Sequence, residues 1–277
     1  MTGRFKPGAL KHITSRENPF FKELKKLAAS ARQRSRAGQA LLDGAHLVEA
    51  YLDAGGQPLH LLVNRAAAHD AEVAVLLERI AGVALTQLDD GLFAELTELK
   101  TPSGLLALIE QPQARVAAER SQFALLLEDI QDPGNLGSMI RSAAAAGCDA
   151  VFLSPGCADA WSPRVLRAGM GGHFVLSVHE SADLTGVARA FRGRIYAAAL
   201  DAEKSLYECE LRGNVAFAIG NEGAGLSRVW RDAAVMLAIP MPGKVESLNA
   251  AAAAAICLFE AVRQRSTAPP SARMPSG

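Results

Sequence analysis

The chain has 277 residues, of which 49% are apolar and 21% are charged, with 29 Lys and Arg against 29 Asp and Glu. This balance is typical of globular proteins and excludes a chain that is disordered throughout. At roughly 100–200 residues per domain, the length predicts one large domain or two modest ones.

The charge is unevenly distributed along the chain. Residues 1–40 hold ten Lys or Arg and only two Glu, although the whole chain has a formal net charge of zero. A basic segment is a candidate phosphate-binding face. It is equally a feature of solvated helix surfaces, so the charge alone leaves nucleic-acid binding open.

The apolar and cysteine patterns narrow the class of protein. The most apolar run, 250–259, has about half of the roughly 20 residues that a transmembrane helix needs. The basic N-terminus lacks the apolar core of a signal peptide, so we expect a cytoplasmic protein with no membrane partner. The four cysteines lack metal-binding spacing, which predicts reduced thiols and no metal site. They are Cys148, Cys157, Cys209 and Cys257.

The first half of the chain alternates strand-like and helical patterns. We expect a flexible lead-in over 1–10, a compact α/β domain over 11–110 and a polar linker over 111–121. Asn18 and Pro19 form a helix-start signal. Helices are predicted over 20–29, 45–52, 72–80 and 91–96, and strands over 40–42, 59–63, 83–85 and 105–109.

The second half, 122–266, alternates more strongly and precedes a tail over 267–277 that reads as disordered. Strands alternating with helices predict an α/β domain with a mostly parallel sheet covered on both faces. The predicted strands are 123–127, 150–153, 174–178, 195–199, 215–219 and 235–239, and the main helices are 136–146 and 248–263.

Three glycine-containing segments, 128–137, 220–226 and 239–249, each follow a predicted strand of this second domain. Ligands of parallel sheets bind beyond the carboxyl ends of the strands, and glycine lets the backbone approach a ligand closely. One such loop is usually a plain connector, but three that pair glycine with Asn, Glu or Ser favour a ligand site. The segments match neither a P-loop nor the dinucleotide fingerprint, and the chain has no nucleophile-elbow or H-E-x-x-H motif.

Together the three segments resemble the SpoU (TrmH) family of RNA ribose 2′-O-methyltransferases, within the SPOUT class. The match covers about residues 122–265, and Ala145 stands where many relatives have Asp. A second, smaller match joins residues 13–19, Asp43-Gly44 and Pro102-Ser103-Gly104 to the L30e-like RNA-recognition domain of many relatives, with Asp43 in place of Glu. The stretches that carry the main match are Asp132-Pro133-Gly134-Asn135-Leu136-Gly137 with Arg141, Gly220-Asn221-Glu222-Gly223-Ala224-Gly225-Leu226, and Ile239-Pro240-Met241 with Ser247-Leu248-Asn249.

The resemblance implies a trefoil knot, S-adenosylmethionine as cofactor, structured RNA as substrate, and a homodimer with its active site at the interface. It implies catalytic roles for Arg141, Asn135, Glu222, Ser247 and Asn249. It places the cofactor against Ala199, Gly220, Ile239, Met241 and Leu248. The basic residues expected to bind RNA are Arg16, Lys22, Lys25 and Lys26 in the first domain and Arg164 and Arg167 in the second.

The leading interpretation is a methyltransferase acting on a ribose 2′-hydroxyl of 23S rRNA. A tRNA 2′-O-methyltransferase is the alternative substrate assignment, and a non-catalytic RNA-binding knot protein is the alternative class. The presence of the implied catalytic residues disfavours the latter, and the missing fingerprint disfavours a nucleotide-dependent oxidoreductase. Because arginine stays protonated, we expect Arg141 to orient the ribose or a phosphate rather than to act as a literal base.

Overall fold

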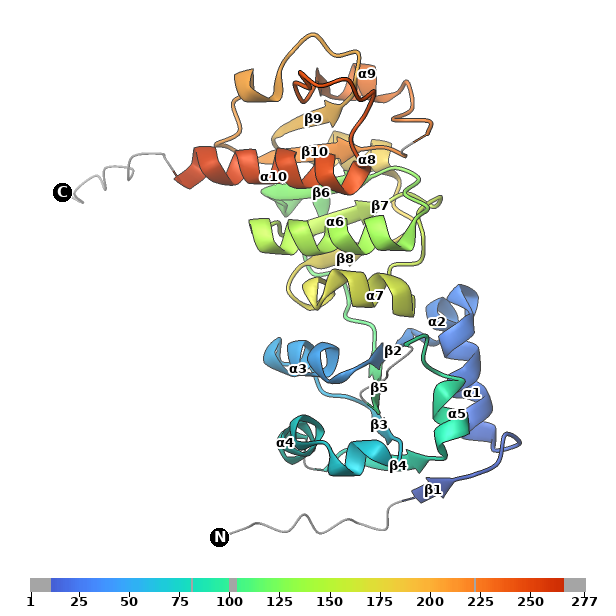
Figure 1. The fold of residues 1–277 in the computed structure, drawn as a ribbon. Helices are drawn as coiled ribbons and strands as arrows, with labels where there is room; N and C mark the ends of the chain where they lie inside the picture. The colour runs from blue at the N-terminus through green and yellow to red at the C-terminus, as the bar shows by residue number, and fades with distance from the viewer. Residues whose placement is uncertain (1–10, 81, 100–103, 222, 267–277) are drawn as a thin grey trace, which may run out of the picture. The chain divides into compact units, whose positions relative to one another are not determined.

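The computed structural model describes residues 11–80, 82–99, 104–221 and 223–266. The chain divides into two compact units, and the first comprises residues up to 112 together with 159–174 (Figure 1). The second comprises 113–158 and the residues from 175 onward. Segment 159–174 therefore groups with the N-terminal unit, although it lies within the stretch 122–266 that sequence order predicts to be one domain. In the described part of the chain, no helix is long and apolar enough to span a bilayer.

The first unit is built on a five-stranded mixed sheet in the order β1-β4-β3-β5-β2. Strands β1, β4 and β3 are parallel, and β5 is antiparallel to β3 and β2. The buried side chains of Phe21, Leu24 and Leu27 pack helix α1 (Pro19–Ala29) against this sheet. The elements are β1 (Lys11–Ile13), α1 (Pro19–Ala29), α2 (Ala31–Ala37), β2 (Gln39–Asp43), α3 (Ala45–Asp53), β3 (His60–Val63), η1 (Ala66–His69), α4 (Ala71–Arg79), β4 (Ala84–Leu88), α5 (Asp90–Ala94), β5 (Leu105–Glu110), α7 (Pro163–Gly169) and η3 (Gly172–Phe174).

Helix α1 begins where the sequence predicts, because the Asn18 side chain accepts hydrogen bonds from the first free N–H groups and Pro19 occupies the first helical position. Helix α2 was not predicted. Its sequence, ARQRSRA, has no apolar stripe, and local caps define it instead. The Ser30 side chain caps its start, and Gly38 ends it in the left-handed conformation, with φ of 62°.

The second unit contains a six-stranded sheet in the order β11-β9-β10-β6-β7-β8, parallel throughout. The mostly parallel α/β architecture is thus confirmed. Helices α6 and α10 lie side by side on one face (Figure 1), and α8 and α9 pack on the other. The elements are η2 (Ala118–Arg120), β6 (Phe123–Leu127), α6 (Pro133–Ala146), β7 (Ala150–Leu153), β8 (Ser177–His179), α8 (Leu184–Ala190), β9 (Arg194–Ala198), η4 (Leu206–Glu208), β10 (Val215–Ile219), α9 (Trp230–Ala233), β11 (Val235–Leu237) and α10 (Ala250–Ser266).

One predicted strand is displaced. The apolar run 174–178 predicts a strand, but the chain forms a 3₁₀ turn at Gly172–Phe174 and enters β8 only at Ser177. The reason is tertiary, because the Phe174 ring packs edge-on against Tyr51 of the first unit, with ring centroids 5.1 Å apart. The trefoil knot stays a prediction from the resemblance.

Candidate active site

The three glycine-containing segments all follow strands of the second unit's sheet. Strands β6, β10 and β9 are neighbours, and β11 lies beside β9. Because these strands are parallel, their carboxyl ends share one edge of the sheet. The loops that follow β6, β10 and β11 therefore leave the sheet on the same side.

The five residues predicted to hold the cofactor line one cavity of about 380 Å³ at this edge. They are Ala199, Gly220, Ile239, Met241 and Leu248. The size lies within the range of roughly 300–1,000 Å³ typical of small-molecule sites. Backbone segments and apolar side chains form most of the wall, which suits an adenosine group better than a phosphate-rich ligand.

Glycine is required at the start of the second loop. A Cβ at Gly220 would lie 2.3 Å from the backbone oxygen of Gly225, so a larger residue would force the two backbone segments apart. The loop forms a tight turn, because the Gly225 N–H donates to the backbone oxygen of Asn221 at 2.8 Å. Gly225 has a φ of 68°, in the left-handed region. The Asn221 side-chain oxygen accepts the N–H groups of Gly223 and Ala224. These bonds shape one wall of the cavity.

Asn135 and Asn249 come together although 114 residues separate them. The Asn249 amide donates to the Asn135 side-chain oxygen at 2.9 Å. Each is fixed locally: the Asn135 N–H donates to Asp132, the N-cap of α6, and the Asn249 oxygen accepts from Ala251 and Ala252 at the start of α10. The first and third segments thus meet beside the cavity that Ser247 and Leu248 line.

The other predicted catalytic residues are placed differently. Arg141 is exposed on α6 and has no ion-pair partner among the residues that the structure describes. Ser247 lines the cavity. Glu222 lies outside the described residues. The fold therefore gathers Asn135, Ser247 and Asn249 near the cavity and leaves the Arg141 guanidinium free for another partner.

Several residues of this cavity have no role in the sequence interpretation, and Asn221, Asp201 and Arg231 are among them. Asn221 shapes the loop, and Asp201 and Arg231 line the wall as an ion pair at 2.5 Å. The hydrogen bond from Arg231 lowers the pKa of the Asp201 carboxyl. The position of Asn221 within G-N-E-G-A-G is a signal that could have identified it. Nothing in the sequence pairs Asp201 with Arg231, which lie 30 residues apart.

Four of the six predicted RNA contacts lie on β1–α1 of the first unit, and three of them already have acidic partners. Arg16 and Lys25 both donate to Glu95, each at 2.6 Å, and Lys22 pairs with Glu17. Hydrogen bonds from Lys25 and Arg16 hold the pKa of the Glu95 carboxyl below its ordinary value. Lys26 is exposed and has no ion-pair partner within the described ranges.

The two predicted RNA contacts on α7 both approach Glu98, Arg164 at 3.4 Å and Arg167 at 3.9 Å. The Nε and Nη2 atoms of Arg167 are buried and have no hydrogen-bond partner among the described residues, and the Arg167 charge acts on Asp43. Burial nevertheless raises the pKa of the Asp43 carboxyl. Arg167 is therefore a partly buried member of the first unit, whereas Arg164 remains largely exposed.

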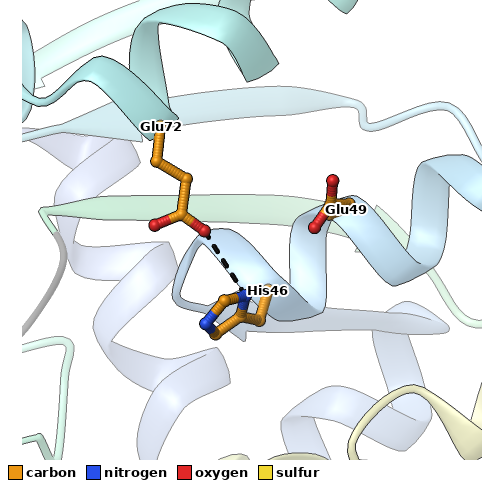
Figure 2. A group of neighbouring side chains, drawn as sticks. All are labelled: His46, Glu49 and Glu72. Atoms are coloured by element: carbon orange, nitrogen blue, oxygen red, sulfur yellow. Dashed lines mark ion pairs between the residues drawn. The ribbon is translucent and has the colours of Figure 1, made fainter.

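A group with metal-ligand chemistry lies on α3 and α4 of the first unit (Figure 2). His46, Glu49 and Glu72 are all exposed. The His46 Nδ1 atom lies 3.3 Å from a Glu72 oxygen (Figure 2). A Glu49 oxygen lies 3.6 Å from the Arg79 guanidinium. Surface ion pairs account for the arrangement, so we assign no metal to it. The prediction of no metal stays untested.

The cysteines carry no chemistry in this site. All four are free, and burial raises the pKa of the Cys257 thiol to about 12. Burial also raises the pKa of Cys148, Cys157 and Cys209. Thiols in this state are poor nucleophiles and poor metal ligands.

Two family models match the chain. The SpoU rRNA Methylase family matches residues 122–259, and the MRM3-like substrate binding domain matches residues 18–107. The first spans all three glycine-containing segments, and the second covers most of the first unit.

Named relatives agree with these matches. The chain is 34% identical over 258 residues to the 23S rRNA (guanosine(2553)-2′-O)-methyltransferase RlmP of Bacillus subtilis, covering 90% of this chain and 98% of that protein. An AdoMet-bound rRNA methyltransferase from Sinorhizobium meliloti superimposes with a TM-score of 0.78 at 27% identity, covering 92% of this chain and 98% of that one. AviRb from Streptomyces viridochromogenes, a SpoU methyltransferase in complex with AdoMet, gives a TM-score of 0.78 at 28% identity, covering 91% of this chain and all of that one. The chain belongs to the SpoU rRNA methylase family.

Proposed function

We propose that this protein transfers the methyl group of S-adenosylmethionine to a ribose 2′-hydroxyl of 23S rRNA. The observation that carries the proposal is the Asn249–Asn135 hydrogen bond, which joins the α6 segment to the rim of a cavity of cofactor size. The relatives supply the substrate, because RlmP and the RlmB of Xylella fastidiosa are both named as 23S rRNA guanosine 2′-O-methyltransferases.

The bound cofactor would supply an activated methyl group on a sulfonium, so the protein's task is to position a ribose and remove one proton. The transfer would form a C–O bond at the ribose 2′-oxygen and break the C–S bond of the sulfonium, so the protein has to hold the ribose in line with the methyl group while the hydroxyl proton leaves. Asn135, held by Asn249, presents its amide beside the cavity. Arg141 is exposed, so its forked guanidinium can hold the ribose or a neighbouring phosphate.

We further propose that the protein is a homodimer whose active site lies at the interface. The outer face of α6 and α10 supports this, because Arg141 and Ala145 are exposed on α6 and Phe259 is 48% exposed on α10. Aromatic side chains are enriched at surfaces that a partner covers. A second copy there would enclose Arg141.

The first unit would hold structured RNA through its free basic side chains. Lys26 on α1 and Arg32 and Arg36 on α2 are exposed and lack ion-pair partners in the part of the chain that the structure describes. Contacts of this kind bind phosphates, so RNA affinity should fall steeply with salt. Substituting Lys26 and Arg32 by Ala should flatten the salt slope by about 0.7–0.9 per lost contact. Unchanged affinity and slope would remove these side chains from the RNA-binding surface.

The deciding experiment measures methyl transfer from labelled S-adenosylmethionine to total RNA that lacks the enzyme's own modification. Wild type should label 23S rRNA, and Arg141→Ala should lose at least 100-fold in rate while still binding cofactor. Arg189→Ala, an exposed arginine on α8, is the matched control and should behave as wild type. Label in tRNA instead would replace the rRNA assignment. Cofactor binding with no label in any RNA would contradict the assigned activity.

A further inference from the structure

Glu128, the first residue after β6, makes three hydrogen bonds to the segment that follows the glycine-rich loop. Its carboxylate accepts the Ser227 N–H at 2.7 Å, the Ser227 hydroxyl at 2.7 Å and the Trp230 indole N–H at 3.1 Å. No Lys, Arg or His pairs with Glu128 among the residues that the structure describes. The Glu128 carboxylate therefore acts as the acceptor of these three hydrogen bonds, which its negative charge strengthens.

The next residue, Asp129, holds the other end of the same loop. Its backbone oxygen accepts the Asn221 side-chain amide at 2.9 Å. Asp129 has a φ of 55°, in the left-handed region, and its carboxylate accepts the Ser154 hydroxyl at 2.6 Å. A Cβ at Gly156, which follows β7, would fall 2.1 Å from that carboxylate. The Asp129 side chain therefore packs directly against the Gly156 backbone, and this contact helps to hold Asp129 in its strained conformation.

Between these two attachments lies the part of the loop that lines the cavity, including Gly223 to Leu226. Two glycines and an alanine in this stretch give it many conformations when it is untethered, and ordering it on binding would weaken cofactor affinity. Two adjacent residues at the end of β6 restrain both ends and remove most of that cost.

We propose that Glu128 is a positioning residue that holds residues 223–227 in their cofactor-binding shape, acting through Ser227 and Trp230. The inference rests on the proposed function, in which S-adenosylmethionine occupies this cavity. Glu128 follows directly on the strand that leads to Asn135 and α6, so the same attachment ties the cofactor loop to the segment that carries the catalytic residues.

The test compares variants of the full-length protein. Glu128→Ala removes all three acceptor contacts. Glu128→Gln is the conservative variant, because its oxygen can accept both N–H groups while its amide donates to the Ser227 hydroxyl, which can rotate to accept. Ser227→Ala removes the hydroxyl alone. Glu119→Ala is the matched control, since Glu119 is an exposed glutamate of the same unit that does not line the cavity.

Two readouts separate positioning from general destabilisation. Calorimetry should show the Kd for S-adenosylmethionine rising roughly tenfold in Glu128→Ala, less than threefold in Glu128→Gln, and not at all in Glu119→Ala. Steady-state assays should show a matching rise in KM for the cofactor, with kcat at saturating cofactor within twofold of wild type and RNA affinity unchanged. Amide exchange of the cofactor-free protein should speed up selectively over 223–230 in Glu128→Ala.

Each other outcome contradicts the inference. Equal cofactor affinity in wild type and Glu128→Ala would overturn the role of Glu128 and leave the proposed function standing. A lower kcat with unchanged KM, together with faster exchange throughout the unit, would make Glu128 a structural residue only. Failure of wild type itself to bind S-adenosylmethionine would overturn both the proposed function and this inference.

Discussion

Arg34 lies within the basic stretch of the N-terminal unit, yet it is only 5% exposed. Its Nε and Nη2 atoms donate to one Asp159 oxygen at 2.7 and 2.5 Å. Its Nη1 atom donates to the backbone oxygens of Leu27 and Ala28 near the end of α1. The other Asp159 oxygen accepts the Trp161 N–H at 2.9 Å. This pair attaches segment 159–174 to the first unit, and we predict that its loss releases the segment.

The size of the effect follows from burial. The Arg34 and Asp159 side chains are 6% and 17% exposed, so Arg34→Met leaves a carboxylate that is largely out of water and that keeps, among the described residues, the Trp161 N–H as its partner. Removing one member of such a pair costs about 3–5 kcal/mol, whereas replacing both by apolar groups is often nearly neutral. We therefore expect Arg34→Met to cost about 4 kcal/mol, and addition of Asp159→Ala to restore at least half of that loss.

Tryptophan fluorescence can report the result locally, because the chain has two tryptophans and each unit contains one. In a Trp230→Phe background only Trp161 emits, and it lies two residues from Asp159 and is 3% exposed. With a urea m-value of about 2 kcal/mol/M, the Trp161 transition should move down by roughly 2 M in Arg34→Met. The exposed Arg36→Met on the same helix should leave the midpoint in place. A shift below about 0.5 M, or a double variant less stable than Arg34→Met, would refute the assignment of a buried, mutually dependent pair.

The remaining predictions concern pH, the cofactor loop and assembly. Burial lowers the pKa of His173 from its ordinary 6.5 to about 4. Between pH 6.5 and pH 4, this histidine is therefore protonated in the unfolded chain and neutral in the folded chain. The free energy of unfolding consequently falls as the pH drops from 6.5 to 4. Urea titrations should show a loss of about 3 kcal/mol from this residue over that window, absent in His173→Gln; a parallel pH dependence in the variant would contradict it. Gly220→Ala should weaken S-adenosylmethionine binding at least tenfold by calorimetry, because its Cβ meets the Gly225 backbone at 2.3 Å, whereas Gly243→Ala, with open space around it, should bind normally. Phe259→Glu should shift the mass measured by light scattering from dimer to monomer and lower activity, and a dimer of wild-type mass would place the interface elsewhere.

Much of the second unit could be predicted from the chain itself. Buried parallel strands are short apolar runs, and the six predicted here all correspond to strands, with 174–178 displaced towards Ser177–His179. The position of the three loops could also be predicted, because a parallel sheet places every post-strand loop at one edge, whereas the five residues expected to hold the cofactor came from the family resemblance. Helix α2 escaped prediction because caps, rather than apolar periodicity, define it.

What the sequence by itself determined is therefore the α/β class and the three loops, since both depend on local patterns of glycine, strand and cap. Through the family resemblance it also identified five of the residues that line the cavity. Only the tertiary structure decided which charges are available. Counting Lys and Arg residues gives the sign of the charge on a surface but does not show which acidic residues pair with them. Arg34 pairs with Asp159, which lies 125 residues further along the chain, and Arg16 and Lys25 both bind Glu95. Segment 159–174 likewise joins the first unit because Arg34 binds Asp159 and Tyr51 packs against Phe174. Pairing and burial depend on which elements pack together, and no local stretch of sequence carries that information.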